Sequence, residues 1–161
     1  MLTEIRAFEP TDAAAASFMV MAAFHAAVAP HYPQGGVDAF TAYADALPLA
    51  RRPRAGHRTW VVHEDGEILG LVELRLPAHV AMLFVAPAAQ RRGLGRRLLD
   101  HAAAFVASQE PRPDEITVHA SPNAVAFYER SGFIASGPER EKDGVRFTPM
   151  RGPLQAFENR R

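Results

Sequence analysis

The residues of this chain best suited to bind an anion lie where an apolar stretch runs through a glycine-containing turn into a helix-forming stretch. The segment is Val85-Ala86-Pro87-Ala88-Ala89-Gln90-Arg91-Arg92-Gly93-Leu94-Gly95-Arg96-Arg97-Leu98. The first N–H groups of a helix have no partner within it and lie at the positive end of its dipole, so they can bind a phosphate. Gly93 and Gly95 lack a Cβ, which lets the main chain approach a pyrophosphate closely or adopt positive φ. The four arginines add positive charge, and the segment predicts a phosphate-binding turn.

A second segment, further along the chain, combines side chains that can donate protons and hydrogen bonds. It is Ser121-Pro122-Asn123-Ala124-Val125-Ala126-Phe127-Tyr128-Glu129-Arg130-Ser131-Gly132-Phe133. Its first three residues are typical of a helix start and Ser131-Gly132 of a helix end, so a short helix is predicted over residues 124–130. Asn123 can cap this helix, and the Tyr128 hydroxyl can anchor it by a hydrogen bond.

The elements that must position these two segments follow from hydrophobic periodicity. Alternation or continuous apolar runs predict strands over residues 2–8, 59–63, 68–74, 79–85, 116–120, 133–136 and 145–150. Asp65-Gly66 is a strong hairpin signal, and Lys142-Asp143-Gly144 is a second predicted turn. Helical patterns cover residues 13–28, 37–47 and 92–108. We expect residues 48–56, with Arg51, Arg52 and Arg54, to form a solvated loop.

Composition restricts the class of protein. The 161 residues are 48% hydrophobic, enough for one core, so we expect a single domain over residues 1–154 and a disordered tail over residues 155–161. Eighteen basic and eighteen acidic residues give zero net charge, and hence no global field that attracts nucleic acid or an anionic membrane. The absence of cysteine excludes disulfides and thiolate metal sites, and no His-Glu-x-x-His spacing occurs, so we expect no metal. With neither a signal peptide nor a membrane-spanning run, we expect a cytoplasmic location.

The two segments resemble the signatures of the GNAT acyltransferase superfamily. The first signature is Gln or Arg, two residues, Gly, one residue, and Gly or Ala directly after a strand, which here is Gln90-Arg91-Arg92-Gly93-Leu94-Gly95. The second is an asparagine, a short helix, an aromatic-Tyr pair and Gly-Phe, present here as Asn123, Phe127-Tyr128 and Gly132-Phe133. The predicted order of elements is that of the family over nearly the whole chain. Residues 144–150 also resemble small bacterial members.

The resemblance implies an α+β fold: a mixed, mostly antiparallel sheet of six to seven strands, flanked by about four helices. Two neighbouring parallel strands, here residues 79–85 and 116–120, are implied to splay apart and hold acetyl-CoA. Leu83, Phe84 and Val85 are implied to bind its pantetheine arm through their backbone, with Asn123 hydrogen-bonding nearby. The pyrophosphate is implied to contact the turn, at Gln90, Arg91, Arg92, Gly93, Leu94, Gly95 and Arg96.

The implied reaction is direct transfer of the acetyl group from acetyl-CoA to a primary amine, without a covalent enzyme intermediate. It requires a neutral amine, stabilisation of the oxyanion and a proton for the departing thiolate. The resemblance assigns Tyr128 as general acid and as a cofactor contact. The base stays open between Glu73 and His119, with His79 as a third candidate, because each of them can instead be structural and a water molecule can relay the proton.

The acceptor stays open among small-molecule, amino-acid-like and protein amines, and the donor range beyond acetyl is also open. Candidates to line its pocket are Tyr32, Tyr43, His25, His31 and Asp38. Two alternative functions are a non-catalytic acyl-CoA-binding or regulatory module and a toxin-like acetyltransferase of aminoacyl-tRNA. The arginines at 51–54 suggest the second and the zero net charge disfavours it. We expect no membrane partner and no nucleic acid, and a homodimer is a further option.

Overall fold

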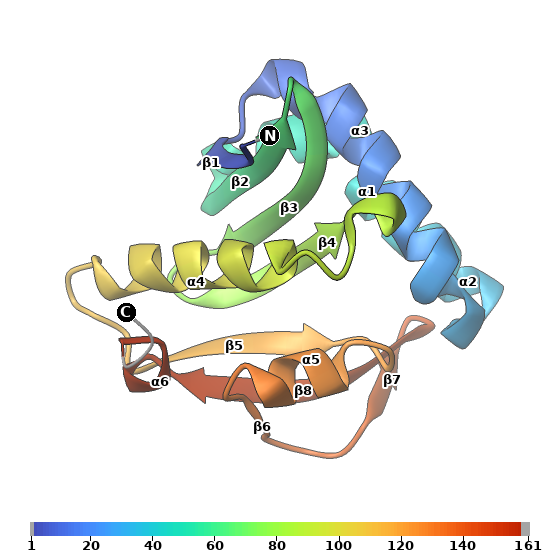
Figure 1. Ribbon diagram of the computed structural model, residues 1–161. Coiled ribbons are helices and arrows are strands. Elements are labelled where there is room, and N and C mark those ends of the chain that lie inside the picture. The colour runs from blue at the N-terminus through green and yellow to red at the C-terminus, as the bar shows by residue number, and fades with distance from the viewer. Residues whose placement is uncertain (1, 159–161) are drawn as a thin grey trace.

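The computed structural model describes residues 2–158, and its eight strands form a mixed sheet (Figure 1). The strand order is β1-β2-β3-β4-β5-β8-β6, and β7 pairs with β8 beside this path. Within the described residues β4 and β5 are parallel, and every other pair is antiparallel. The strands are β1 Glu4–Ala7, β2 His57–Glu64, β3 Glu67–Arg75, β4 His79–Val85, β5 Glu115–Ala120, β6 Ile134–Ala135, β7 Arg140–Lys142 and β8 Val145–Pro153. The α+β class and the mostly antiparallel sheet are confirmed, with eight strands where six to seven were expected.

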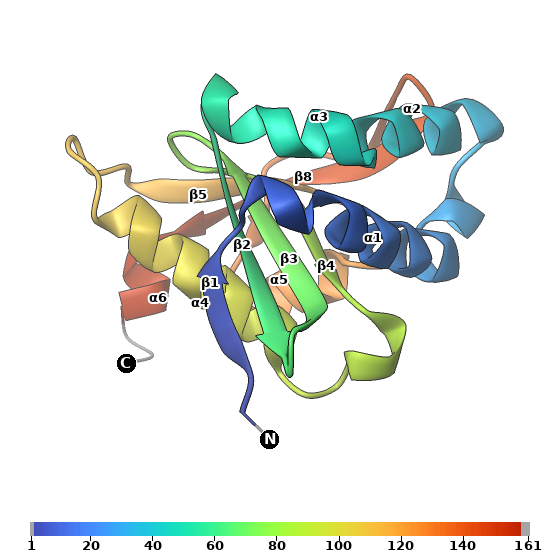
Figure 2. The ribbon, with the colours of Figure 1, turned by 90° about the horizontal axis from the view of Figure 1, so that it is seen from above.

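In the described part of the chain, six α-helices cover the two faces of the sheet (Figure 2). They are α1 Ala13–Ala27, α2 Gln34–Ala44, α3 Ala46–Arg51, α4 Leu94–Ala107, α5 Val125–Arg130 and α6 Gln155–Glu158, with short 3-10 turns between several of them. One apolar cluster joins α4, α5 and α6 to side chains such as Val72 and Leu74 of β3. A second joins α1 and α3 to the opposite face, at Leu71 of β3 and Met82 of β4. Alternation along β3 therefore sends successive side chains into two different cores.

Tight turns at both predicted positions are confirmed, although the second joins different strands. Asp65 and Gly66, with φ of 52° and 81°, connect β2 to β3, and Asp143 and Gly144, with φ of 55° and 79°, connect β7 to β8. The sequence patterns missed β7. Its three residues are all charged and exposed, so they show no alternation between apolar and polar positions.

The region between α1 and β2 is more helical than predicted. Instead of one helix over 37–47 and a loop over 48–56, the chain forms α2, then α3, then a 3-10 turn at Arg52–Ala55. Asp45 separates the two helices because its backbone is extended, and its side chain accepts a hydrogen bond from the N–H of Ala46 at the start of α3. Pro48 is tolerated in the first turn of α3, where its missing N–H has no helical partner to lose.

Part of the disordered tail predicted over residues 155–161 is helical. Residues 155–158 form α6, and the Phe157 ring packs edge-on against Phe133 at a centroid distance of 5.9 Å. A single buried aromatic residue at this position fixes the segment to the core, which hydrophobic periodicity over four residues cannot reveal. Residues 159–161 lie outside the described part of the chain.

The expected splaying of the parallel strands is confirmed. β4 pairs with β5 only at His79 with Thr117 and at Val80 with Val118. At that point β4 carries a bulge: Glu73 of β3 faces Met82 and Leu74 faces Val80, which leaves Ala81 between the two pairs. A bulge bends its strand, so the edge of β4 from Ala81 to Val85 has no strand partner on the β5 side.

No helix among residues 2–158 has the length and hydropathy needed to span a bilayer.

Candidate active site

The predicted phosphate turn has the backbone geometry of an anion site. Gly93 adopts φ of 76° and is the N-cap of α4, and Arg91 also has positive φ, at 66°. The N–H groups at the start of α4 therefore lie at the end of the turn without partners in the helix. The Gln90 side chain donates to the carbonyl of Val85 at 3.2 Å, which closes the turn against the end of β4. Arg92 pairs with Glu64 of β2 at 2.6 Å, so its charge is partly compensated.

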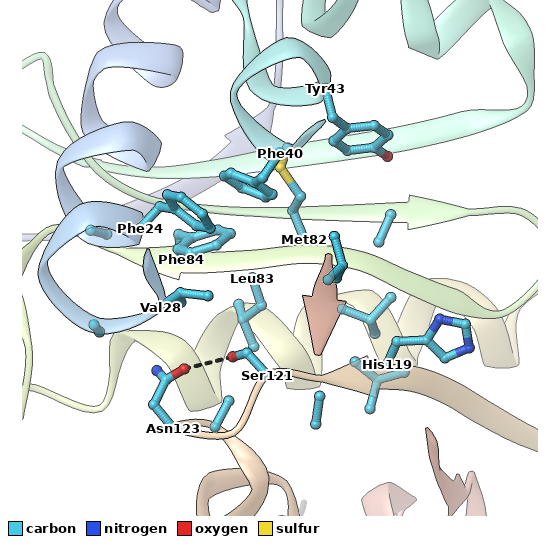
Figure 3. Close-up of a pocket in the computed structure, with 18 of the residues that line it drawn as sticks. Phe24, Val28, Phe40, Tyr43, Met82, Leu83, Phe84, His119, Ser121 and Asn123 are labelled. Atoms are coloured by element: carbon cyan, nitrogen blue, oxygen red, sulfur yellow. Dashed lines mark hydrogen bonds between the residues drawn. The ribbon is translucent and has the colours of Figure 1, made fainter. Parts of the chain in front are cut away.

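A cavity of about 450 Å³ lies at the place where β4 and β5 part. Its walls come from α1, α2, β3, β4, β5, α5 and β8 and from loop residues such as Ser121 and Asn123 after β5. Figure 3 labels ten of the lining residues. One end lies near Val28 and Asn123, and His119 lies toward the other. Leu83, Phe84, Val85, Gln90, Asn123 and Tyr128 all line this cavity, so the structure brings together six of the twelve expected cofactor contacts. The remaining six belong to the adjoining turn and the start of α4.

An aromatic wall closes the cavity on the side of α1 and α2. Phe24 of α1 stacks on Phe40 of α2 at a centroid distance of 4.1 Å, and Phe40 lies 5.5 Å from Phe84 of β4. Tyr32 and Tyr43 line the cavity as expected, whereas His25, His31 and Asp38 are absent from its lining. This wall was not anticipated, because its three phenylalanines are far apart in sequence and each alone is an ordinary core residue.

Tyr128 is almost completely buried, with 4% of its surface exposed, and it lines the cavity. Burial raises the pKa of its phenol above the ordinary value, so the group is protonated at neutral pH. Its ring makes edge contacts with Phe127 and Phe133. Among residues 2–158 the hydroxyl has no hydrogen-bond partner. The alternative in which this hydroxyl anchors the helix is therefore wrong for the described part of the chain.

Asn123 does not cap the helix that follows it. The N-cap of α5 is Ala124, and no side chain caps that helix. Instead the Asn123 Oδ1 accepts a hydrogen bond of 2.7 Å from the Ser121 hydroxyl (Figure 3). The Asn123 amide NH2 group is thereby held at the cavity, in an exposed position where it can donate to a ligand.

Glu73 lies beneath the cavity wall in a buried network of polar groups. Its side chain is 0% exposed, and it accepts hydrogen bonds of 2.7 Å from both the Tyr43 hydroxyl and Arg52 Nε. Arg52 also donates to the carbonyl of Tyr43 and lies 3.7 Å above its ring. His57 Nδ1 is 3.6 Å from the same carboxylate, and burial is the main cause that lowers its pKa. The network ties α2 and the 3-10 turn after α3 to the sheet, and Glu73 does not line the cavity.

This network corrects the prediction for the arginine cluster. Arg51 and Arg54 are exposed, but Arg52 is only 12% exposed at its side chain and forms the ion pair with Glu73. The expected solvated loop is thus wrong for Arg52, since a charge partner 21 positions further along the chain cannot be seen from local composition. Two exposed arginines make a smaller basic patch than three, which further weakens the aminoacyl-tRNA hypothesis.

Two histidines form an edge contact at the far end of the cavity. The rings of His79 and His119 lie 4.7 Å apart, and His119 stacks on Phe147 of β8 at 4.3 Å. His79 Nδ1 is 2.8 Å from the Thr117 hydroxyl. Burial is the main cause that lowers the pKa of His79 to about 4, and it also lowers that of His119. Both imidazoles are therefore neutral at pH 7 and able to accept a proton. No group of three potential metal ligands occurs among the described residues.

The fold and this site define an α+β protein in which a glycine-containing turn before α4 adjoins a cavity between two parted parallel strands. Residues 28–154 match the family model of the acetyltransferase (GNAT) domain. The chain therefore belongs to the GNAT family of acetyltransferases, as the two signature segments predicted.

Similar proteins agree with this assignment. The peptidyl-lysine N-acetyltransferase YiaC of Escherichia coli is 34% identical over 92 residues, which cover 56% of this chain and 60% of that protein. The mycothiol acetyltransferase of Beutenbergia cavernae is 37% identical over 81 residues, 46% of this chain and 27% of that protein. The chain thus matches less than two thirds of the length of either relative.

Solved structures match over almost the whole chain. A GCN5-related N-acetyltransferase from Rhodopseudomonas palustris, with the further description "Aminotransferase, Class-II", superposes with a TM-score of 0.81 at 25% identity. The match covers 95% of this chain and 96% of that one. The PaiA N-acetyltransferase of Thermoplasma acidophilum, solved in complex with coenzyme A, has a TM-score of 0.76 at 18% identity and covers 95% and 99% of the two chains. At that identity the likeness shows the fold.

Proposed function

We propose that this protein transfers an acetyl group from acetyl-CoA directly to a primary amine, without a covalent enzyme intermediate. The observation that carries the proposal is the unpaired edge of β4 beside the cavity, with the phosphate turn at one end and Tyr128 in the wall. Family membership and the coenzyme A bound to the Thermoplasma relative support it.

The residues present fit acetyl-CoA. An extended arm with amide groups can pair with the free backbone edge at Leu83, Phe84 and Val85 as an added strand would. The turn from Gln90 to Gly95, with the first N–H groups of α4 and the nearby Arg91 and Arg96, suits a pyrophosphate. When bound, acetyl-CoA would supply the acyl group as a thioester.

Tyr128 and His119 carry the two proton transfers in this proposal. The amine nitrogen forms a bond to the thioester carbon, and the carbon–sulfur bond breaks. His119, neutral and in the cavity lining, takes the proton that the amine nitrogen loses, directly or through water. Tyr128, held protonated by burial, donates its proton to the departing sulfur and recovers one from solvent through water.

The geometry favours His119 over Glu73 as the base. The Glu73 carboxylate is enclosed by Tyr43 and Arg52 and does not reach the cavity lining. His119 is exposed there, with its ring held between His79 and Phe147. We assign Glu73 a positioning role, since it fixes Tyr43 in the wall.

The test begins with calorimetric titration of acetyl-CoA, coenzyme A and ATP, followed by thiol release with a panel of amines. We expect micromolar binding of both coenzyme A species, weaker binding of ATP, and thiol release that depends on an amine. Because the chain has no cysteine, it adds no thiol background. Binding without thiol release from any amine would instead favour a non-catalytic acyl-CoA-binding module. If neither coenzyme A species bound, both functions would be excluded.

A further inference from the structure

At the end away from the phosphate turn, the described lining of the cavity carries a positive charge and no carboxylate. Arg75, the last residue of β3, lines it together with His79 and His119. No aspartate or glutamate occurs among the described residues that line the cavity. Arg75 is thus the permanently charged group of that lining, because both histidines are neutral at pH 7.

The positive charge of the Arg75 guanidinium is not neutralised by an ion pair with a nearby carboxylate of the described residues. Within residues 2–158 Arg75 forms no ion pair and no side-chain hydrogen bond. Glu73 lies on the same face of β3, two residues earlier, but its two oxygens already accept hydrogen bonds from Tyr43 and Arg52. Glu139, which directly precedes β7, pairs with Arg146 of β8 at 2.9 Å.

Two cations of the β7–β8 hairpin act on His119, although residues 139–146 contain as many acidic as basic residues. Arg140 and Lys142 of β7, with Arg75, are the charged residues whose electrostatic effect lowers the pKa of His119. Their side chains alternate onto the same face as Phe147, because Arg140 pairs with Phe147 and Lys142 with Val145, which lines the cavity. Arg75 is thus the cation in the described lining, and Arg140 and Lys142 lie outside the lining but close enough to act on His119.

We propose that the acceptor is an apolar primary amine that also carries a carboxylate, of the kind found in a free apolar amino acid. Its carboxylate binds the Arg75 guanidinium, and its apolar part packs on Phe40, Phe84 and Met82. An arginine and a carboxylate form charge-assisted hydrogen bonds, often in pairs. A polyamine or a second ammonium group would meet no carboxylate in the lining and would lose its hydration without compensation. This inference rests on the proposed acetyl transfer.

The test compares leucine, methionine and phenylalanine with their carboxamides, which have the same shape without the negative charge. Spermidine serves as the cationic comparison. We expect the wild type to acetylate the free amino acids with about 10- to 100-fold higher kcat/KM than the amides, the range for a hydrogen bond to a charged group. Arg75→Met should remove this preference by raising KM for the acids alone, and Arg75→Glu should invert it.

Arg151→Met is the matched control. Arg151 is an exposed arginine of β8, it lies 3.8 Å from Glu115, and it does not line the cavity, so its loss should leave the preference unchanged. Equal use of acids and amides by the wild type, preference for spermidine, or an unchanged preference in Arg75→Met would overturn the proposal.

A second measurement separates this proposal from acetyl transfer itself. Calorimetric titration of the three amino acids into the coenzyme A-saturated protein requires no reaction. Binding that Arg75→Met abolishes and Arg151→Met retains supports the carboxylate site, even if no thiol release is seen. Thiol release from amides or polyamines, together with no binding of the acids, would leave the proposed function standing and this inference refuted.

Discussion

At the scale of single residues, Tyr128 combines burial with a hydroxyl that has no partner among the described residues. Replacing it with phenylalanine keeps the ring contacts with Phe127 and Phe133 and removes only the proton donor. We expect Tyr128→Phe to lower kcat by about 10²- to 10⁴-fold, the usual contribution of general acid catalysis. Calorimetry should give a nearly unchanged Kd for coenzyme A. Unchanged turnover would remove Tyr128 from the mechanism.

His79 makes the stability of the protein depend on pH. Its pKa is about 4 in the folded protein and 6.5 in an ordinary environment, so between these values the unfolded chain binds more protons. The free energy of unfolding should therefore fall as the pH drops from 6.5 toward 4, by less than about 1.4 kcal/mol per pH unit for this partly exposed group. His79→Gln should weaken this dependence in urea unfolding at pH 7 and pH 5. Equal pH dependence in both proteins would contradict the assignment.

At the scale of elements, the turn before α4 can be tested against a second glycine of the same conformation. Gly93 and Gly56 have φ of 76° and 83°, and a Cβ at either position would meet no atom within 4 Å. Glutamate at either site should thus cost a similar amount, about 1–2 kcal/mol, for left-handed backbone. We expect Gly93→Glu to raise the Kd of coenzyme A at least about 10-fold by repelling the pyrophosphate.

Gly56→Glu is the control for this comparison. Gly56 lies directly before β2, in the segment that joins the sheet to the helices over the acceptor side. Its glutamate variant should keep the wild-type Kd for coenzyme A. Equal loss of affinity in both variants would mean that backbone strain, and not the phosphate turn, caused the effect.

The ion pair between Arg52 and Glu73 joins the helical layer to β3. Because Glu73 is fully buried, Glu73→Ala should lower the free energy of unfolding by about 3–5 kcal/mol, since it leaves the Arg52 charge without its partner. The double variant Arg52→Met with Glu73→Met should recover most of that loss. Chemical denaturation of the variants gives the coupling, and purely additive effects would contradict a shared buried pair.

At the scale of the whole molecule, α2 meets the β7–β8 hairpin across the cavity. A Cβ on Gly36 would lie 2.1 Å from the carbonyl oxygen of Gly144, so only glycine permits this contact. Gly36→Ala should lower the free energy of unfolding by about 1–3 kcal/mol and raise KM for the acceptor, because the wall must move away from the hairpin. Its neighbour Gly35 has open space, so Gly35→Ala should leave both quantities nearly unchanged or raise stability slightly.

The contact between α2 and the hairpin also explains why the helix begins earlier than predicted. The helix predicted over residues 37–47 left out Gly35 and Gly36, because glycine is a poor helix former. In the structure Gly36 lies inside α2 because the hairpin, more than 100 residues away in sequence, packs directly on it. The close approach of two backbones stabilises this arrangement, and local propensity carries no sign of it.

The residues of the candidate site also fall into two groups: those that local sequence could predict and those whose role depends on distant contacts. Gly93, Asn123 and Tyr128 could be singled out from the sequence because each belongs to a short segment whose geometry depends on neighbouring residues. Arg75 and the aromatic wall could not, since their importance comes from distant partners. One signal for Arg75 existed: alternation places it on the same face of the strand as Glu73.

Local residue patterns were enough to predict the hairpin at Asp65-Gly66, the glycine-containing turn before α4 and the short helix with Tyr128, and through them the family. Each depends on hydrogen bonds and backbone angles within about a dozen residues. Which charges are compensated could be seen only in the folded chain, where, among the described residues, Glu73 lies in a closed network and Arg75 lines the cavity without an ion pair. Burial and charge pairing depend on contacts between distant segments, so local sequence could not predict which charged side chains line the cavity.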